Sequence, residues 1–496
     1  MTYVIPQALA DAVSSLENLG TQIESANIAG LPNTTGILPA AADEVSAAIT
    51  SLFNAHGGGY QQLAAQAQVF HQQFTQRLAA SAASYVGTEV VNAEQVLWNK
   101  VGQLEQPFLP LITQLESNFT YVSPPLVAPP LPSVTNSTVA LLMGGTNFPV
   151  LPTHYVNQIM SAYITPNFDG AMGTAIYTPE QLWPLTPALG NLTLGQSIAQ
   201  GVPLLNAAIN TELGQGNKVV VWGTSQSSTV LTNEIRNLIA AGSPNTNQLS
   251  FILTGDPNNP NGGPFERFPG LYVPGLDVLF NGATPPNSPY PTMIFTNQYD
   301  GVANFPQYPL NVVSDVNAIA GFLYGAHDYA DFTPSQMANY IQLPTSPAYT
   351  GKTLYYEMLS QNLPLVTPLR IYGTPPYGNA LADLLQPDLR VLVDMGYGSG
   401  EYANIPTPAS LFELPNPFTI GPDLVHGTIQ GAEASLVDLG LLPTSYYPMG
   451  QYPFSPVLNP DLNFPLPQSS NTGVSLLTGF EGQLMQSLGL VPPWDQ

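Results

Sequence analysis

The stretch KVVVWGTSQSS, residues 218–228, decides the fold. It begins with a short apolar run rich in β-branched residues and continues into a tight turn with Ser225 at its centre. From Ser228 to Ala240, apolar residues recur at helical spacing. A strand, a turn with a central serine and a helix form the context of a nucleophile elbow, in which the turn lifts the serine hydroxyl out of a parallel sheet. The stretch therefore predicts an α/β fold with Ser225 as the nucleophile.

The residues beside the serine fit this interpretation with one departure. Strand and helix approach each other closely at such an elbow, so small side chains are needed there, and Gly223 is one of them. Ser227 stands where the common motif has a second glycine, which still leaves a small side chain. The pattern G-x-S-x-S alone is a weak signal, and its alternative is an ordinary Gly/Ser-rich turn. The flanking strand and helix favour the nucleophile.

A serine nucleophile needs a histidine base, and two of the five histidines follow Ser225 in the chain order Ser, Asp, His of sheet hydrolases. His327 lies in a loop-like stretch after a helical segment, where such a base is expected, and we favour it. His426 lies in a proline-rich tail, and His154 precedes the elbow and would need another topology. The alternative role for His327 is an ordinary hydrogen-bonded surface histidine.

Two aspartates compete for the role of the carboxylate that orients the base. Asp300 directly follows residues 294–299, which continue the strand-like run that begins at 291, and the carboxyl ends of parallel strands face the same edge as the elbow. Asp256, in GDPNNP at residues 255–260, is the rival. Either residue could instead cap a turn through nearby backbone amides. We favour Asp300.

The oxyanion of an acyl-transfer intermediate needs two backbone donors. The amide of Gln226, directly after the serine, is the first. The loop GGTN, residues 144–147, follows the first predicted strand and supplies the second, which we assign to Thr146. This loop lacks the lysine of a P-loop and the G-x-G-x-x-G pattern of a dinucleotide site. No metal or organic cofactor is expected.

The chain divides by composition into four expected segments. Residues 1–95 form two amphipathic helices, joined by a Gly/Pro-containing loop at Ala29–Pro39, and residues 96–136 form a proline-rich linker. Strands alternate with helices over residues 137–404, which indicates a mostly parallel, doubly wound sheet of the α/β-hydrolase type. Residues 405–496 form a Pro/Asn/Gly-rich extension that either wraps the domain or lacks order.

Within that extension, Val474 to Leu490 has apolar residues at helical spacing. We expect this helix to pack on the parent domain, with contact to a membrane surface as the alternative.

Composition narrows the class of function. The 496 residues contain 8 Lys and Arg against 32 Asp and Glu, a net charge of -24, which argues against nucleic-acid binding. Cysteine is absent, which excludes disulfides and thiolate chemistry. No apolar run reaches the roughly 18 residues of a transmembrane helix. The first residues lack the pattern of an ordinary cleaved signal peptide.

Several motifs together resemble a mycobacterial PE family protein with a C-terminal PE-PPE domain. They are FNAHG at residues 53–57, FHQQF at 70–74, GTSQS at 223–227, YDGVANFPQYPL at 299–310 and LADLLQPDLR at 381–390. The resemblance implies a cutinase-like α/β-hydrolase with esterase activity. Its catalytic triad carries over to the serine at 225, the aspartate at 300 and the histidine at 327, which the residues suggest unaided.

The resemblance also implies an export route and a partner. PE domains pair with a PPE-family protein and are exported by type VII secretion with its chaperone, and the export signal Tyr-x-x-x-Asp/Glu matches Tyr85 and Glu89. A chance pair at helical spacing is the alternative. Pro6-Gln7 stands where the name-giving Pro-Glu occurs. The resemblance places the protein outside the cell or at the cell-envelope surface, peripherally associated.

The sequence analysis therefore predicts a secreted serine esterase or lipase acting on lipid esters through an acyl-enzyme. An acyltransferase on cell-envelope glycolipids shares the first half-reaction and is the enzymatic alternative. A non-catalytic cell-surface or immunomodulatory protein with a vestigial hydrolase fold is the alternative from another class, and the intact Ser, Asp, His set argues against it.

Overall fold

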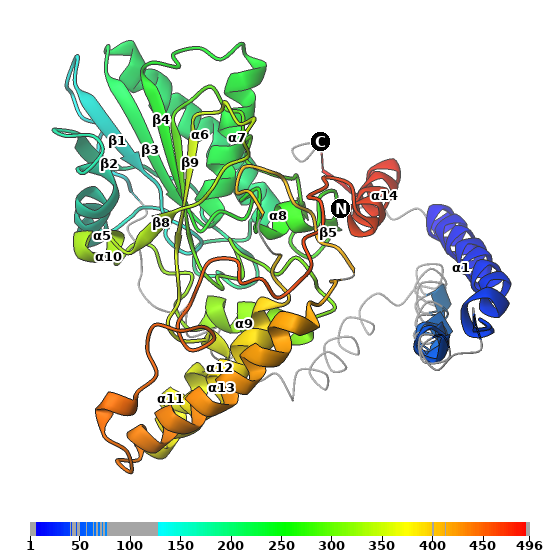
Figure 1. The fold of residues 1–496 in the computed structure, drawn as a ribbon. Helices are drawn as coiled ribbons and strands as arrows, with labels where there is room; N and C mark the ends of the chain where they lie inside the picture. The colour runs from blue at the N-terminus through cyan, green and yellow to red at the C-terminus, as the bar shows by residue number, and fades with distance from the viewer. Residues whose placement is uncertain are drawn as a thin grey trace. The chain divides into compact units, whose positions relative to one another are not determined.

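The computed structural model describes residues 6–39, part of the positions between 41 and 76, and residues 127–492 apart from 399, 400 and 412. The chain forms two compact units, Met1–Pro110 and Leu111–Gln496. Residues 96–126 of the expected linker lie outside the described residues, and so do Tyr85 and Glu89. Both units appear in Figure 1.

The first unit contains the long helix α1, Pro6–Thr35, and helical residues at 50–55 and 57–62. The expected loop from Ala29 is wrong in its first half, because the helix continues through Pro32 to Thr35. A proline removes one backbone donor from a helix. In this last turn the hydroxyls of Thr34 and Thr35 donate to the carbonyl oxygens of residues 30 and 31 at 2.9 and 2.8 Å.

The second unit is built on a seven-stranded sheet of order β2-β1-β3-β4-β7-β9-β8 (Figure 1). All neighbours pair in parallel except β8 and β9, which are antiparallel. The mostly parallel, doubly wound sheet of an α/β-hydrolase is thus confirmed. The strands are β1 Thr138–Leu142, β2 Met172–Ala175, β3 Lys218–Thr224, β4 Leu249–Thr254, β7 Thr292–Asn297, β8 Tyr340–Gln342 and β9 Thr353–Met358.

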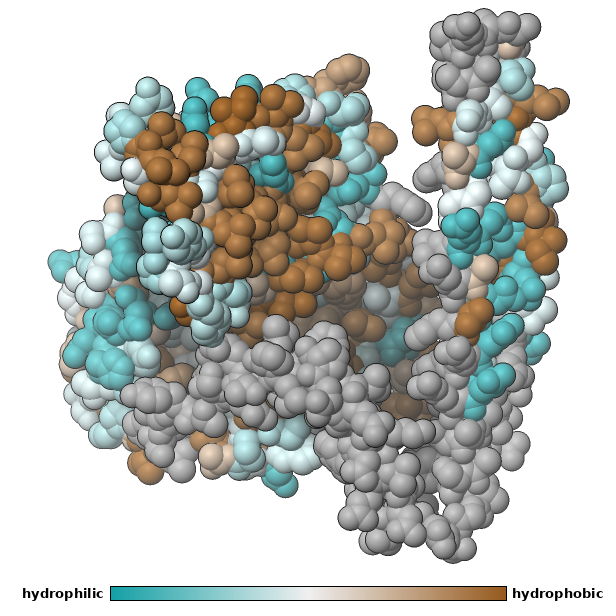
Figure 2. All heavy atoms as spheres, turned by 90° about the horizontal axis from the view of Figure 1, so that it is seen from below, coloured by the Kyte–Doolittle hydropathy of each residue, from teal (hydrophilic) through white to brown (hydrophobic). Residues whose placement is uncertain are grey.

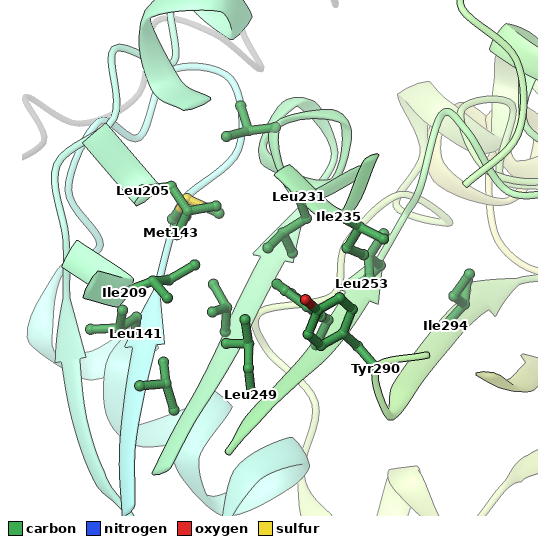
Figure 3. Packing of buried hydrophobic residues seen from close by; sticks show 14 of the residues in the cluster. Leu141, Met143, Leu205, Ile209, Leu231, Ile235, Leu249, Leu253, Tyr290 and Ile294 are labelled. Atoms are coloured by element: carbon green, nitrogen blue, oxygen red, sulfur yellow. The ribbon is translucent and has the colours of Figure 1, made fainter. Parts of the chain in front are cut away.

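Helices cover both faces of the sheet because alternate residues of each buried strand point to opposite sides. On one face, α6 (Leu194–Gly214) and α7 (Gln226–Ala240) pack on side chains of β1, β3 and β4. Figure 3 shows Leu205 and Ile209 of α6 and Leu231 and Ile235 of α7 against this face. The core between sheet and helices fixes where β3 ends and α7 begins, which is where the site lies.

The opposite face is covered by α5, Thr153–Ile159, and the π turn η2, Met160–Ile164. Their buried side chains pack against the other set of strand residues, including Trp222 of β3. Tyr163 contacts the Trp222 ring at 5.9 Å and the Phe295 ring of β7 at 5.2 Å between centroids. Both faces of the central strands are therefore apolar, which explains their continuous hydrophobic runs in the sequence.

The remaining elements lie between these strands and after them in the chain. They are α8 Pro264–Arg267, β5 Tyr272–Val273, β6 Val278–Leu279, α9 Val312–Leu323, α10 Pro334–Met337, η3 Pro364–Val366, α11 Thr367–Tyr372, α12 Tyr377–Asp394, α13 Pro417–Asp438, η4 Thr444–Tyr446 and α14 Gly473–Ser487. Figure 1 shows α12 and α13 side by side below the sheet. Seen from below, a broad face of the second unit is hydrophobic (Figure 2).

The extension after residue 404 is built into the second unit over its described part. Helix α13 packs along α12, although Pro422 lies inside it and the sequence did not indicate a helix there. Helix α14 lies on the β5–β6 hairpin, where a Cβ at Gly482 would be 1.9 Å from the carbonyl oxygen of Gly270. Glu481 accepts the amide of Tyr272 at 2.8 Å. The predicted packing of this helix on the parent domain matches these contacts.

Three arginines, called here the internal arginines, join loops of the second unit through main-chain oxygens. Arg236 donates to three successive carbonyl oxygens, those of residues 281–283, at 2.7 to 3.1 Å. Arg267 donates to the carbonyl oxygen of Thr407 at 2.6 Å, and Arg390 binds a main-chain oxygen after β9 at 2.6 Å. Burial lowers the pKa of Arg267 to about 10, so its guanidinium stays charged at neutral pH.

Candidate active site

Ser225 occupies the turn between β3 and α7 in a conformation that few residues adopt. Its φ is 56° and its ψ is −120°. Residues other than glycine rarely take positive φ, and such strained residues cluster at functional sites. Its backbone amide donates to the carbonyl oxygen of Thr254 in β4 at 3.0 Å, which holds the turn against the neighbouring strand. The geometry is that of a nucleophile elbow.

The departure at Ser227 has a structural reason. The side chain is fully buried, and its hydroxyl accepts the amide of Thr224 at 2.8 Å and donates to the carbonyl oxygen of the same residue at 3.0 Å. Ser228 adds a bond from its hydroxyl to the carbonyl oxygen of Gly223 at 3.0 Å. A Cβ at Gly223 would be 2.7 Å from Leu231, so glycine is required there. Serine at 227 closes the elbow through two hydrogen bonds that glycine could not make.

The loop after β1 lies directly against the nucleophile. A Cβ at Gly145 would be 3.2 Å from the Cβ of Ser225, tighter than most such contacts, so the glycine lets the loop come close to the serine. The amide of Phe148 donates to the carbonyl oxygen of Gly145 at 2.9 Å, and Asn147 between them has a φ of 74°, as at the third position of a type II turn. Thr146 lies in this turn, half-buried, and Gln226 is the first residue of α7.

Asp300 and His327 form a hydrogen-bonded pair after β7 and α9. The Nδ1 atom of His327 lies 2.9 Å from each carboxylate oxygen of Asp300, which is fully buried. The amide of Val302 also donates to this carboxylate at 2.9 Å. The structure thus brings into contact the two residues that the sequence favoured as acid and base, Asp300 and His327.

Tyr329 and Asn297 hold this pair in place, and the sequence analysis did not identify either. The Tyr329 hydroxyl donates to Asp300 at 2.6 Å and accepts the amide of Asn297 at 2.8 Å. Burial raises the pKa of Tyr329 well above its usual value, so the hydroxyl keeps its proton. The Asn297 side chain donates to the carbonyl oxygens of Ala326 and Asp328, the two neighbours of the histidine, at 2.8 and 3.3 Å.

Gly255, directly after β4, packs against the imidazole of His327. Its φ is 56°, and a Cβ there would be 2.8 Å from Cε1 of His327 and 2.8 Å from the ring of Tyr329. The preceding residue, Thr254, accepts the amide of Ser225. The imidazole therefore lies over the strand next to the one that carries the serine.

The link from base to nucleophile is open in this structure. The Nε2 atom of His327 is buried and makes no hydrogen bond among the described residues, so none joins it to the hydroxyl of Ser225. Catalytic hydrogen bonds are often long before substrate binds and tighten in the complex. Nε2 is the ring nitrogen left for a proton from the serine, because Nδ1 is bound to Asp300.

The rival residues make contacts other than those of the pair. Asp256 is fully buried and accepts the hydroxyl of Thr284 at 2.7 Å and the amide of Asn258 at 2.9 Å, which is turn capping. Burial raises the pKa of Asp256 to about 7. His426 lies exposed on α13, and His154 lies exposed in the first turn of α5.

A buried acid lies beside the Thr146 turn. Glu180 has no exposed surface, and its carbonyl oxygen accepts the amide of Asn147 at 2.8 Å. Neither of its carboxyl oxygens makes a hydrogen bond of ordinary geometry to a described residue. Burial raises its pKa from 4.5 to about 8, and the Thr178 hydroxyl lowers it by less. At neutral pH this side chain is therefore a neutral acid.

A cavity of about 70 Å³ lies apart from this chemistry. Arg267, Glu357 and Glu401 are among its lining residues, and neither Ser225 nor His327 is. Burial raises the pKa of Glu357 to about 8.

Within residues 127–492 and the other described positions, no group of three or more His, Cys, Asp or Glu could hold a metal ion. The part of the chain that the structure describes contains no helix long and apolar enough to cross a membrane.

Comparison with protein-family models gives two matches. Residues 2–92 match the PE family, and residues 169–398 match the PE-PPE domain. Among solved structures, an esterase from Pyrobaculum calidifontis aligns with 57% of this chain and 88% of its own at 13% identity. Its TM-score of 0.21 is too low to support any argument about fold or function.

Three curated relatives come from Mycobacterium tuberculosis. The PE family protein PE3 is 46% identical over 99% of this chain and 100% of its own length. Esterase PE16 is 41% identical over 89% of this chain and 78% of its own. SL1278 acyltransferase Chp1 is 31% identical over 56% of this chain and 67% of its own. The similarity to PE3 spans both units.

Proposed function

The chain belongs to the PE family and carries a PE-PPE domain, and from this premise we propose that it is a serine esterase acting on lipid esters. One observation carries the proposal: the buried Asp300 binds Nδ1 of His327, whose imidazole lies over Gly255 beside β4, the strand next to the strained elbow of Ser225. The similarity to esterase PE16 supports the same class of reaction.

The residues divide the work as in other serine hydrolases. Ser225 Oγ attacks the ester carbonyl carbon, and His327 Nε2 takes the hydroxyl proton and then gives it to the leaving alcohol. Asp300 holds the imidazole and stabilises the imidazolium. The backbone amides of Gln226 and Thr146 donate to the oxyanion. Water then hydrolyses the acyl-enzyme by the same steps in reverse.

The test is hydrolysis of p-nitrophenyl esters of increasing chain length by the full chain and by Ser225→Ala. We expect the wild type to turn over these esters and to react with a fluorophosphonate. The variant should fold normally, lose fluorophosphonate labelling and lose several orders of magnitude in kcat. Esterase activity that persists in the purified variant would rule out Ser225, and an inactive wild type would favour the non-catalytic alternative.

Acyl transfer is the second candidate, favoured by the similarity to SL1278 acyltransferase Chp1. A sugar or lipid hydroxyl would then replace water as the acceptor of the acyl group from Ser225. Adding a glycolipid acceptor to the ester assay separates the two. Faster release of p-nitrophenol together with an acylated glycolipid would support transfer, and unchanged free fatty acid would support hydrolysis.

The first unit serves export and partner binding in this proposal. It matches the PE family, and the triad candidates all lie in the second unit. We propose secretion by the type VII system with a PPE-family partner, to the cell-envelope surface. Deleting residues 1–95 should block export and leave esterase activity intact. Tyr85→Ala and Glu89→Ala, tested singly, should each reduce secretion without lowering esterase activity. Loss of activity in a folded truncated protein, or normal export of both point variants, would contradict this.

A further inference from the structure

The side chain of Gln226 has a place that the catalytic scheme does not use. Only its backbone amide is needed there, yet the side chain is 3% exposed and bound at both ends. Its Oε1 accepts the hydroxyl of Thr146 at 2.9 Å, and its Nε2 donates to the hydroxyl oxygen of Ser197 at 2.6 Å. One side chain thus connects the loop after β1, helix α6 and helix α7.

The two proposed oxyanion donors belong to separate pieces of chain. The amide of Gln226 is fixed by the start of α7, whereas that of Thr146 moves with the turn at residues 145–148. The distance between the two amides depends on where this turn lies. The hydroxyl of Thr146 donates to Oε1 of Gln226, a residue 80 positions later in the sequence, and this bond ties one donor to the other.

Ser197 anchors the far end of this connection. It lies in the first turn of α6 and is 1% exposed. Its hydroxyl oxygen also accepts the amide of Gln181 at 2.9 Å, so it is held on two sides. The amide group of Gln226 therefore has a fixed anchor, and the Thr146 turn is positioned against it.

We propose that the side chain of Gln226 is a positioning residue, which sets the spacing of the two oxyanion-hole amides by holding the Thr146 turn. The inference rests on the proposed function. The Gln226 side chain does not touch the substrate, because its Oε1 and Nε2 are both bound to protein groups. It acts on the reaction through the backbone of Thr146.

The expected effect lies between no effect and loss of a donor. Removing one oxyanion donor costs about 10²- to 10³-fold in kcat. A misplaced donor still contributes, so we expect a loss of roughly tenfold. Charge develops on the carbonyl oxygen in the transition state, so kcat should fall while KM for a short-chain ester stays within about twofold.

Thr146→Val tests this most directly, because it removes the hydroxyl, keeps the shape and keeps the backbone amide. Thr146→Ser restores the hydroxyl and should recover kcat. Gln226→Met removes both bonds at similar volume. The double variant should be no worse than Gln226→Met, because the two side chains act as one unit. The control is Thr229→Val, a buried threonine of α7 whose hydroxyl has no hydrogen-bond partner among the described residues.

A second readout separates positioning from general loosening. The affinity of an alkylboronic acid, whose tetrahedral adduct places an oxygen in the hole, should fall in parallel with kcat/KM. The melting temperature of Thr146→Val should stay near that of Thr229→Val.

Several results would overturn the inference. The first is that Thr146→Val and Gln226→Met keep the kcat and the boronic acid affinity of the wild type. The second is a loss of kcat in the double variant that equals the product of the two single losses. The third is that Thr146→Ser does not restore kcat. Failure of the proposed function looks different, because the wild type would then be inactive or Ser225→Ala would remain active. If Gln226→Met does not fold, Thr146→Val and its rescue decide the matter.

Discussion

Replacing the buried acid Glu180 by glutamine should change how stability depends on pH. Folding raises the pKa of Glu180 from 4.5 to about 8, chiefly by burial. Between these values the folded protein holds a proton that the unfolded chain has released. Stability therefore falls as the pH rises through this window. Glutamine has no proton to lose, so the variant should lack this part of the decline.

The magnitude follows from the two pKa values. Each pKa unit corresponds to about 1.36 kcal/mol. By the linkage relation, Glu180 lowers the free energy of unfolding by about 1 kcal/mol at pH 5 and by about 3 kcal/mol at pH 7, relative to its value at low pH. The free energy of unfolding of the variant, relative to the wild type, should therefore rise by roughly 2 kcal/mol between pH 5 and pH 7. Any constant cost of burying an amide cancels in this comparison.

Urea unfolding of both proteins at pH 5, 6 and 7 measures this difference. Tryptophan fluorescence, to which the fully buried Trp222 of the sheet contributes, follows the unfolding. Glu24→Gln, at an exposed position of α1, is the matched substitution outside the core. A difference between Glu180→Gln and the wild type that stays constant from pH 5 to pH 7 would refute the reasoning.

Three further predictions concern the triad. Asp300→Asn should lower kcat by about 10⁴-fold, because the neutral amide favours the wrong imidazole tautomer, and Asp256→Asn should cost little, so steady-state kinetics showing the reverse would exchange the acid. His327→Ala should be inactive and His426→Ala nearly normal in the same assay and in fluorophosphonate labelling; labelling that fails only in the second variant would place the base in the tail. Gly255→Ala should reduce kcat by at least tenfold, because a Cβ 2.8 Å from the imidazole must displace it, and circular dichroism would show whether the fold survives; an active, folded variant would mean that the imidazole moves freely.

Local pattern was enough to predict the central part of the fold. Continuous apolar runs predicted β1, β3 and β7, because these strands are buried on both faces. The elbow followed from a strand, a turn and a helix at fixed spacing. The edge strand β8 and its neighbour β9 were not predicted, because tyrosine and polar residues interrupt their apolar pattern. Helix α13 was not predicted either, because Pro422 and three glycines obscure its periodicity.

The acid and base candidates could be chosen by their order and by strand ends, but the residues that hold them could not. Tyr329 and Asn297 act through hydrogen bonds to residues up to 32 positions away, and no sequence spacing encodes such a contact. Gly255 has its role only because the imidazole lies above it. Ser227 was judged by its size alone, although its hydroxyl makes two bonds within the elbow.

The internal arginines make the second unit a poor substrate for trypsin. Their head groups bind main-chain oxygens inside the unit, so cleavage beside them requires the unit to open. Lys218 and Lys352 are exposed, but the first begins β3 and the second directly precedes β9, where the backbone is held in the sheet. Arg370, in α11, is paired instead with Asp383. In native buffer, the rate at which trypsin cuts at the three internal arginines and these two lysines should therefore follow the population of the opened state. Because the internal arginines bind neutral carbonyl groups, added salt should change that rate little, unlike in proteins held together by exposed ion pairs.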